Sequence, residues 1–261
     1  MNNDASPHQQ QIEAIWDGIS NFGSARTDAA LDFLFDRLCH LLDAQGAYWV
    51  GTVQMSDNSK HDPLSGWRPR AYRLFKGHGA WKETAQEANS RIKKGTVDPT
   101  FIATTRGAGN FRIFTRHQIV DEEWYQSSYY KTCFEPFGIS DGIIVATPVG
   151  DGVESVMGMN RINHPTPHFN QKDIRRLSSA MRPMQWFHHQ LMLGHGLLLA
   201  DNPLTPSERR VLNGLLSEAT EAEIAKQLGL APSTVHTYSK RICNKYGVRG
   251  RTGLTALWLG R

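Results

Sequence analysis

Six polar side chains lie at helical spacing near the end of the chain: Ser233, His236, Thr237, Lys240, Arg241 and Asn244. Val235, Ser239, Ile242 and Tyr246 recur on the opposite face, which predicts a helix with one buried side. Small hydroxyls at the start of such a helix can approach phosphates, and His236 and Lys240, one turn apart, can reach base edges in a major groove. A solvated basic helix face has a similar composition, so two interpretations remain open at this point.

The preceding residues predict the elements that position this helix. Thr205 with Glu208, and Thr220 with Glu223, form two capping boxes, and each starts a helix. Gly229 followed by an apolar residue ends the second helix, and a tight turn leads into the polar one. Two short helices joined in this way form a helix-turn-helix. A last short helix completes an all-α, four-helix domain and carries Leu254, Leu257 and Trp258.

The charge of the chain is concentrated in the same region. Residues 204–261 contain nine Lys/Arg and four Glu, a net charge of +5, whereas the whole chain carries +4, which leaves −1 for residues 1–203. The polar, proline-containing segment 200–203 separates the two parts. A basic module attached to a neutral one is typical of a protein that meets a polyanion. We therefore expect a domain over 1–199, a linker over 200–203 and a second domain over 204–261.

Four stretches of the basic module occur in a fixed order: Leu204-Thr-Pro-Ser-Glu-Arg-Arg-Val-Leu212, Glu223-Ile-Ala-Lys-Gln-Leu-Gly-Leu230, Ser233-Thr-Val-His236 and Ile242-Cys-Asn-Lys-Tyr-Gly-Val-Arg249. Together they resemble the DNA-binding domain of LuxR-type transcription regulators. The resemblance implies that the helix after the turn reads double-stranded promoter DNA, and that the last helix, with Leu254, Leu257 and Trp258, mediates homodimer contacts. It also implies RNA polymerase as a protein partner. The implied DNA-binding residues are Ser233, Thr234, His236, Thr237, Lys240, Arg241 and Asn244.

Four positions depart from the pattern of that family, which usually has a basic residue at 236, a histidine at 238, a leucine at 246 and a serine or threonine at 231. This chain has His236, Tyr238, Tyr246 and Ala231. Ala231 cannot cap a helix through its side chain, which costs ~1 kcal/mol. We expect a DNA target that differs from those usual for the family.

The first domain has a mixed pattern. Apolar periodicity predicts helices over 8–20, 27–44, 81–94 and 170–193, the last capped by Asn170 and kinked at Pro183. Strand patterns occupy 47–53, 70–75, 111–114, 142–147 and 155–161. Helices at both ends of such a set predict an α+β domain, an antiparallel sheet packed with helices.

This domain resembles the GAF-like or autoinducer-binding heads of LuxR-type regulators, through Phe137-Gly-Ile-Ser-Asp-Gly142 and the pair Asp98-Pro99. Acyl-homoserine-lactone receptors carry a Trp-x-x-x-Tyr pair, which no tryptophan of this chain has. We therefore expect a different small-molecule effector in an aromatic pocket; regulation without a ligand, or by a protein antagonist, is the alternative. Asp98 and Asp141 each also suit a turn. The candidate ligand residues are Trp49, Trp67, Tyr72, Trp81, Asp98, Trp124, Tyr125 and Tyr129.

Other classes of protein find little support. No phosphate-binding glycine loop, nucleophile motif or paired receiver carboxylates occur, so we expect neither an enzyme nor a phosphoacceptor. The His164 to His168 pair contains two prolines, and no Cys or His set has metal-ligand spacing, so no metal or cofactor is expected. The three distant cysteines, the polar N-terminus and the short apolar runs predict a cytoplasmic protein with no membrane segment.

Overall fold

A computed structural model describes residues 7–55, 62–76, 90–92, 97–199 and 202–260. The chain forms two compact units. The first, which we call the sheet unit, comprises Met1–Ile19 and Asp32–Gln185; the second, the helical unit, comprises Ser20–Leu31 and Trp186–Arg261. Trp81, residues 200–201 of the expected linker and most of the helix expected over 81–94 lie outside the described residues; of that helix, 90–92 are described and are helical.

The sheet unit is built on a five-stranded sheet in the order β2-β1-β5-β4-β3, in which all neighbouring strands are antiparallel. All five expected strands are confirmed. Their bounds are β1 (Gly46–Gln54), β2 (Trp67–Phe75), β3 (Arg112–Thr115), β4 (Ile139–Gly150) and β5 (Val153–Ile162). β-Bulges interrupt the register of β4 near both of its ends.

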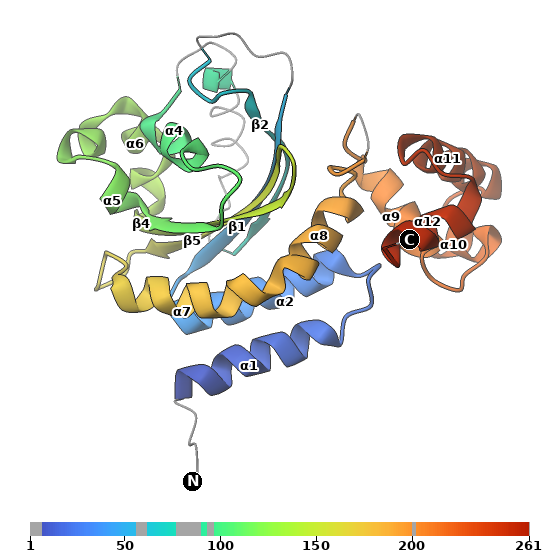
Figure 1. The fold of residues 1–261 in the computed structure, drawn as a ribbon, viewed down its shortest axis with the longest axis horizontal. Coiled ribbons are helices and arrows are strands. Elements are labelled where there is room, and N and C mark those ends of the chain that lie inside the picture. The colour runs from blue at the N-terminus through green and yellow to red at the C-terminus, as the bar shows by residue number, and fades with distance from the viewer. Residues whose placement is uncertain (1–6, 56–61, 77–89, 93–96, 200–201, 261) are drawn as a thin grey trace. The chain divides into compact units, whose positions relative to one another are not determined.

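One face of this sheet is covered by α2 (Thr27–Leu42) and α7 (Gln171–Met181), and α1 (Pro7–Ser20) lies beyond them on the same side (Figure 1). Trp49, Met157 and Val145 are register partners on neighbouring strands, and all three are fully buried. The Nε1–H of Trp16 in α1 donates a hydrogen bond of 2.9 Å to the Ala180 carbonyl oxygen in α7. The helices and this sheet face therefore form a single core, as expected of an α+β domain.

Short helices lie on the other side of the sheet (Figure 1). They are α4 (Pro99–Thr105), α5 (Arg116–Ile119), the 3₁₀ turns Glu122–Gln126 and Glu135–Phe137, and α6 (Ser128–Cys133). Several are started by side-chain caps: Asp98 accepts a hydrogen bond from the Thr100 N–H, and Ser127 accepts one from the Tyr130 N–H. These caps explain why such short segments are helical.

The late helix of the sequence prediction is broken at the expected residue. α7 begins after Asn170, which forms a capping box with Asp173. A 3₁₀ turn over Arg182–Met184 contains Pro183, and α8 (Gln185–Gly194) follows. Proline has no N–H to donate to the preceding helical turn, so the break follows from the sequence.

Four C-terminal helices of the helical unit confirm the expected helix-turn-helix arrangement. They are α9 (Pro206–Leu215), α10 (Glu221–Leu228), α11 (Pro232–Lys245) and α12 (Gly250–Trp258). Both predicted capping boxes are present, and Gly229 ends α10 in the left-handed conformation, with φ +65°. The core contains Val211, Leu212, Ile224, Val235 and Ile242. Among the described residues, no helix combines the length and apolar character needed to cross a membrane.

Candidate nucleic-acid interface and ligand cavity

α11 has one buried face and one polar face, as its periodicity predicts. Val235 and Ile242 are fully buried against α9 and α10. Six of the seven predicted DNA-binding residues are exposed, and Thr234 is half-buried. The Thr237 hydroxyl donates a 2.9 Å hydrogen bond to the Ser233 carbonyl oxygen, which fixes its position one turn into the helix. The fold thus presents the predicted residues on a single surface.

The start of α11 lacks a side-chain cap. Its N-cap residue, Ala231, has extended backbone angles and makes no side-chain capping bond. The first N–H groups of an α-helix have no intrahelical partner, and the helix dipole adds positive potential there. An anion such as a phosphate can bind at this end of a helix. The departure at residue 231 thus leaves the first turn of α11 without the usual internal acceptor.

His236 is held by a contact with Glu221 that was not predicted from the sequence. Its Nδ1 lies 3.1 Å from Oε2 of Glu221, the first residue of α10. Both side chains remain partly exposed. Residues on neighbouring turns of one helix can be paired from the sequence, but this pair joins two helices. Glu221 therefore restricts the ring orientation of a predicted base-reading residue.

Basic residues of α12 extend the polar surface. A hollow beside α11 is lined by His236, Lys240 and Asn244, together with Arg249, the N-cap residue of α12, and Arg251 in its first turn. One guanidinium nitrogen of Arg251 donates to the Ala219 carbonyl oxygen at 2.7 Å. Both arginines belong to the basic charge of residues 204–261, but their position beside the predicted DNA-binding residues was not predicted from the sequence.

The predicted dimerisation residues do not share one environment. Leu254 is fully buried in the core of the helical unit. Leu257 and Trp258 are half-buried and pack against that core. The Trp258 ring makes an edge contact with Tyr246, whose hydroxyl donates a hydrogen bond of 2.5 Å to the Leu193 carbonyl oxygen. Burial raises the pKa of Tyr246. The larger residue at 246 thus has its own hydrogen-bond partner in the core.

The sheet unit contains a cavity of about 90 Å³ with almost entirely apolar walls. Tyr48 and Val50 of β1 line it, together with Ile144 of β4 and Val156 of β5. Gly158 makes room for one of these walls, because a Cβ atom there would lie 2.2 Å from Cζ of Tyr48. Burial raises the pKa of Tyr48. The remaining lining residues are Thr52, Leu64, Trp67, Arg68, Pro69, Ile92, Phe101, Thr104 and Thr105.

The candidate ligand residues fall into separate places. Trp67 lines the cavity. Trp49 lies in the core between sheet and helices, where its Nε1–H donates to the Ser155 hydroxyl at 2.9 Å. Tyr72 is 44% exposed. Neither Trp49 nor Tyr72 is among the cavity-lining residues, so of these three candidates the structure brings only Trp67 to the cavity.

Four further candidates, Asp98, Trp124, Tyr125 and Tyr129, lie in and beside a second group of aromatic side chains. Oδ2 of Asp98 accepts a 2.9 Å hydrogen bond from the Trp124 indole N–H. Trp124 packs on Tyr125, and the buried Tyr129 packs on Phe101, which also lines the cavity. Burial raises the pKa values of Tyr125 and Tyr129, with the charges of nearby carboxylates as a second cause. Phe101 therefore joins this group to the cavity wall.

A buried ion pair, which was not predicted from the sequence, lies next to the cavity wall. The two terminal guanidinium nitrogens of Arg112 each lie 2.7 Å from a carboxylate oxygen of Glu154. Arg112 also donates to the carbonyl oxygen of Thr104, a cavity-lining residue. Glu154 is almost fully buried. The pair joins β3 and β5 to α4, from which part of the cavity wall comes.

Comparison with known proteins identifies the helical C-terminal region. Residues 202–258 match the family model described as bacterial regulatory proteins, luxR family. These residues form a luxR-family domain. The same region is 40% identical over 57 residues to a probable HTH-type transcriptional regulator, GfsR, from Streptomyces halstedii. That alignment covers 22% of this chain, and the chain spans about a quarter (24%) of the length of the relative.

Three solved structures are similar along more of the chain. SdiA in complex with octanoyl-rac-glycerol is 10% identical, with a TM-score of 0.44, over 98% of this chain and 96% of that one. Escherichia coli SdiA in the space group P6522 is 14% identical, with a TM-score of 0.41, over 96% of this chain and 97% of that one. The VqsR LBD domain of Pseudomonas aeruginosa is 12% identical, with a TM-score of 0.47, over 72% and 98%.

Proposed function

We propose that this protein is a transcription regulator that binds double-stranded DNA through α11. The observation that carries the proposal is the luxR-family match at residues 202–258, on a helix-turn-helix whose second helix exposes six predicted contact residues. His236 and Lys240 read base edges in the major groove, while Thr234, Thr237 and Arg241 contact phosphates. Ser233 and the uncapped start of α11 bind one phosphate. Asn244, near the C-terminal end of α11, makes a further contact with the DNA.

The protein acts as a homodimer in this proposal. A single recognition helix reads few base pairs, and twofold symmetry pairs two such helices on half-sites about one helical turn (~34 Å) apart. Leu257 and Trp258 are only half-buried within one chain, and Leu259 beside them is 66% exposed. α12 thus offers an apolar surface for a second copy. RNA polymerase is the further protein partner that regulation of this type implies.

Selection of binding sites from random duplex DNA tests this proposal with the full-length chain. We expect enrichment of an inverted repeat, together with an apparent affinity that falls steeply with salt concentration, because bound phosphates release counterions. Light scattering of the complex should give two chains per site. Failure to enrich any sequence at low salt would contradict the proposal, and a single chain on the selected site would contradict the dimer.

The sheet unit, in our proposal, controls the regulator by binding a small apolar molecule with few polar groups. The cavity beside Tyr48 and Trp67 supports this proposal of a small-molecule site. Its walls are apolar, and it lies in a different unit from the helix-turn-helix. Apolar pockets with a few polar groups are typical of small-molecule sites. Without the Trp-x-x-x-Tyr pair, the effector is not a standard acyl-homoserine lactone.

A thermal-shift screen of a metabolite library tests control by a small molecule. A ligand that binds the folded chain raises its Tm by mass action. We expect at least one apolar compound to raise the Tm of the wild type but not that of Trp67→Ala, a change in the cavity wall. If no compound raises the Tm in this way, we would replace control by a small molecule with regulation without a ligand or by a protein antagonist. The proposal that the chain binds DNA is tested separately and would not be affected.

A further inference from the structure

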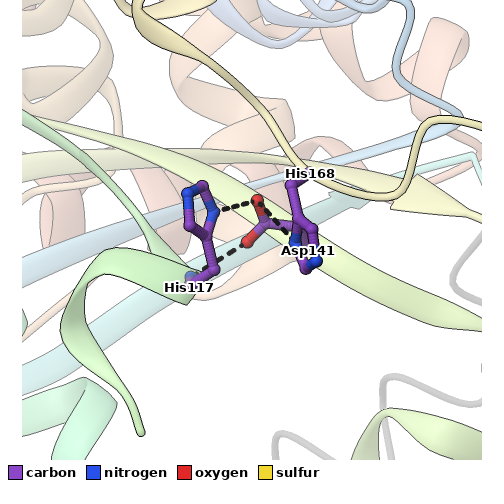
Figure 2. A group of neighbouring side chains, drawn as sticks. All are labelled: His117, Asp141 and His168. Atoms are coloured by element: carbon purple, nitrogen blue, oxygen red, sulfur yellow. Dashed lines mark hydrogen bonds and ion pairs between the residues drawn. The ribbon is translucent and has the colours of Figure 1, made fainter. Parts of the chain in front are cut away.

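Three potential metal ligands from distant parts of the sequence meet at one end of β4 (Figure 2). His117 comes from α5, Asp141 from β4 and His168 from the segment before α7. Nδ1 of His117 lies 2.7 Å from Oδ2 of Asp141, and Nδ1 of His168 lies 3.8 Å from the same oxygen. One ligand atom from each of the three residues lies within 4.8 Å of the other two. Two imidazoles therefore converge on a single carboxylate oxygen.

The Asp141 carboxylate is held in place by the backbone. The sequence analysis expected a turn here, but Asp141 lies within β4 next to a β-bulge and is fully buried. Oδ1 accepts hydrogen bonds from the N–H groups of His117 and Gly142, at 3.2 and 2.8 Å. Oδ2 accepts one from the Phe169 N–H at 3.0 Å. These donors fix the orientation of the carboxylate, as supporting hydrogen bonds do for carboxylates that bind metals.

The segment that carries His168 is also fixed. Nη1 of Arg161 donates to the carbonyl oxygens of Thr166 and His168. Nη2 of the same guanidinium lies 3.5 Å from Oδ2 of Asp173, and this charge pairing reduces the repulsion that Arg161 would exert on a nearby cation. The His168 backbone is thus anchored, while its imidazole remains free to adjust.

The accessibility of the group is uneven in a way that suits an open metal site. The side chain of Asp141 is inaccessible, that of His117 is 30% exposed and that of His168 is 53% exposed. An ion between the three would therefore have protein on one side and water on the other. Three protein ligands and one solvent position are a common arrangement for zinc. A hydrogen-bonded His–Asp pair alone does not account for a second imidazole turned toward the same oxygen.

We propose that His117, Asp141 and His168 bind a divalent transition-metal ion of the zinc class, with water as the fourth ligand. Ligand bonds of about 2.0–2.2 Å to a tetrahedral ion place neighbouring donor atoms about 3.3–3.6 Å apart. The observed separations of 2.7 and 3.8 Å lie on either side of that range, so small side-chain rotations complete the site. Two nitrogens and one oxygen suit zinc better than magnesium or calcium, which prefer oxygen ligands throughout.

The bound ion would link three segments that are distant in the sequence, namely α5, β4 and the segment before α7. α5 follows β3 directly, Asp141 is the third residue of β4, and His168 precedes the Asn170 cap of α7. No metal site was predicted from the sequence, because ligand motifs are recognised by short spacings. Here the spacing runs from 117 to 168, and only the fold brings the ligands together.

Calorimetric titration of the EDTA-treated, tag-free, full-length chain with ZnCl₂ tests the proposal. We expect one Zn²⁺ per chain, a rise in Tm on zinc addition, and visible ligand-field bands when Co²⁺ replaces zinc. His117→Ala and His168→Ala should each weaken zinc binding at least about tenfold, since loss of a ligand costs no less than loss of a supporting group. Both variants should also lose the cobalt bands.

His189→Ala is the matched control, because His189 is exposed on α8 outside the group. It should keep the affinity of the wild type. Circular dichroism confirms that each variant is folded. Absence of stoichiometric binding by the wild type, or equal binding by the wild type and both group variants, would overturn the proposal and leave only the hydrogen-bonded pair of His117 and Asp141, with His168 beside it.

Discussion

The two units of this protein are specified in different ways. In the helical unit the ends of the helices are set by residues a few positions apart, such as Thr205 with Glu208 and Thr220 with Glu223. In the sheet unit the decisive contacts span long stretches, such as the 42 residues between Arg112 and Glu154. Local signals can be read in order along the chain, whereas distant ones exist only after folding. The following predictions test this contrast.

The largest expected effect comes from Arg112→Ala. Removing the guanidinium leaves the Glu154 carboxylate buried without its bidentate partner. Breaking a buried pair in this way costs about 3–5 kcal/mol, measured as the free energy of unfolding in urea. Lys76→Ala, which removes the exposed ion pair with Asp36, is the control and should change that free energy little. Similar losses of unfolding free energy in the two variants would show that the buried pair stabilises the fold no more than the exposed one.

Gly158→Ala should have the next largest effect. The added Cβ would lie 2.2 Å from the Tyr48 ring, so the ring must move toward the cavity. Overpacking of this kind costs about 1–3 kcal/mol, and it should also abolish the thermal shift caused by any effector. Gly150→Ala in β4 is a suitable control, because nothing lies within 4 Å of its Cβ position. A ligand response that survives in Gly158→Ala would place the effector elsewhere.

Caps in the helical unit should give smaller effects of opposite sign. Thr220→Ala removes the acceptor for the Glu223 N–H and should cost about 1 kcal/mol. Ala231→Ser supplies a cap to α11, whose N-cap residue already has extended angles, and should stabilise the unit by a similar or smaller amount. Thermal unfolding of both variants checks the signs. If Ala231→Ser does not raise the Tm, the first N–H groups of α11 already have other hydrogen-bond acceptors.

A smaller effect, greatest at neutral pH, is expected from Glu208→Gln. Desolvation raises the pKa of Glu208, but hydrogen bonds from Lys245 and Thr205 outweigh it, so the pKa is lower than in the unfolded chain. The ionised group therefore stabilises the fold above its unfolded pKa of about 4.5, and this stability is lost as the pH falls through the folded pKa. Unfolding measured from pH 6 to pH 3 should depend less on pH in Glu208→Gln. Identical pH profiles would contradict this role.

The same contrast explains what the sequence could predict. Caps and turn residues fixed the limits of α9, α10 and α11, because each acts on its nearest neighbours. In β1 the alternation predicted a strand but could not tell which face meets the helices. Trp49 was therefore grouped with ligand candidates, although it lies on the opposite face of β1 from Tyr48 and Val50. The group of His117, Asp141 and His168 gave no sequence signal, since its members are joined only by the sheet.

The most direct test of the central claim is the affinity of the full-length chain for its selected DNA site after a single change in α11. Fluorescence anisotropy should show that Lys240→Ala loses about 1–3 kcal/mol of binding free energy and relaxes the preference at one base position. Lys172→Ala removes the same charge from α7 in the other unit and serves as the control. We predict near-wild-type binding for the control and a large loss for Lys240→Ala. Equal affinity and unchanged base preference in both variants would contradict the assignment of α11 as the recognition helix.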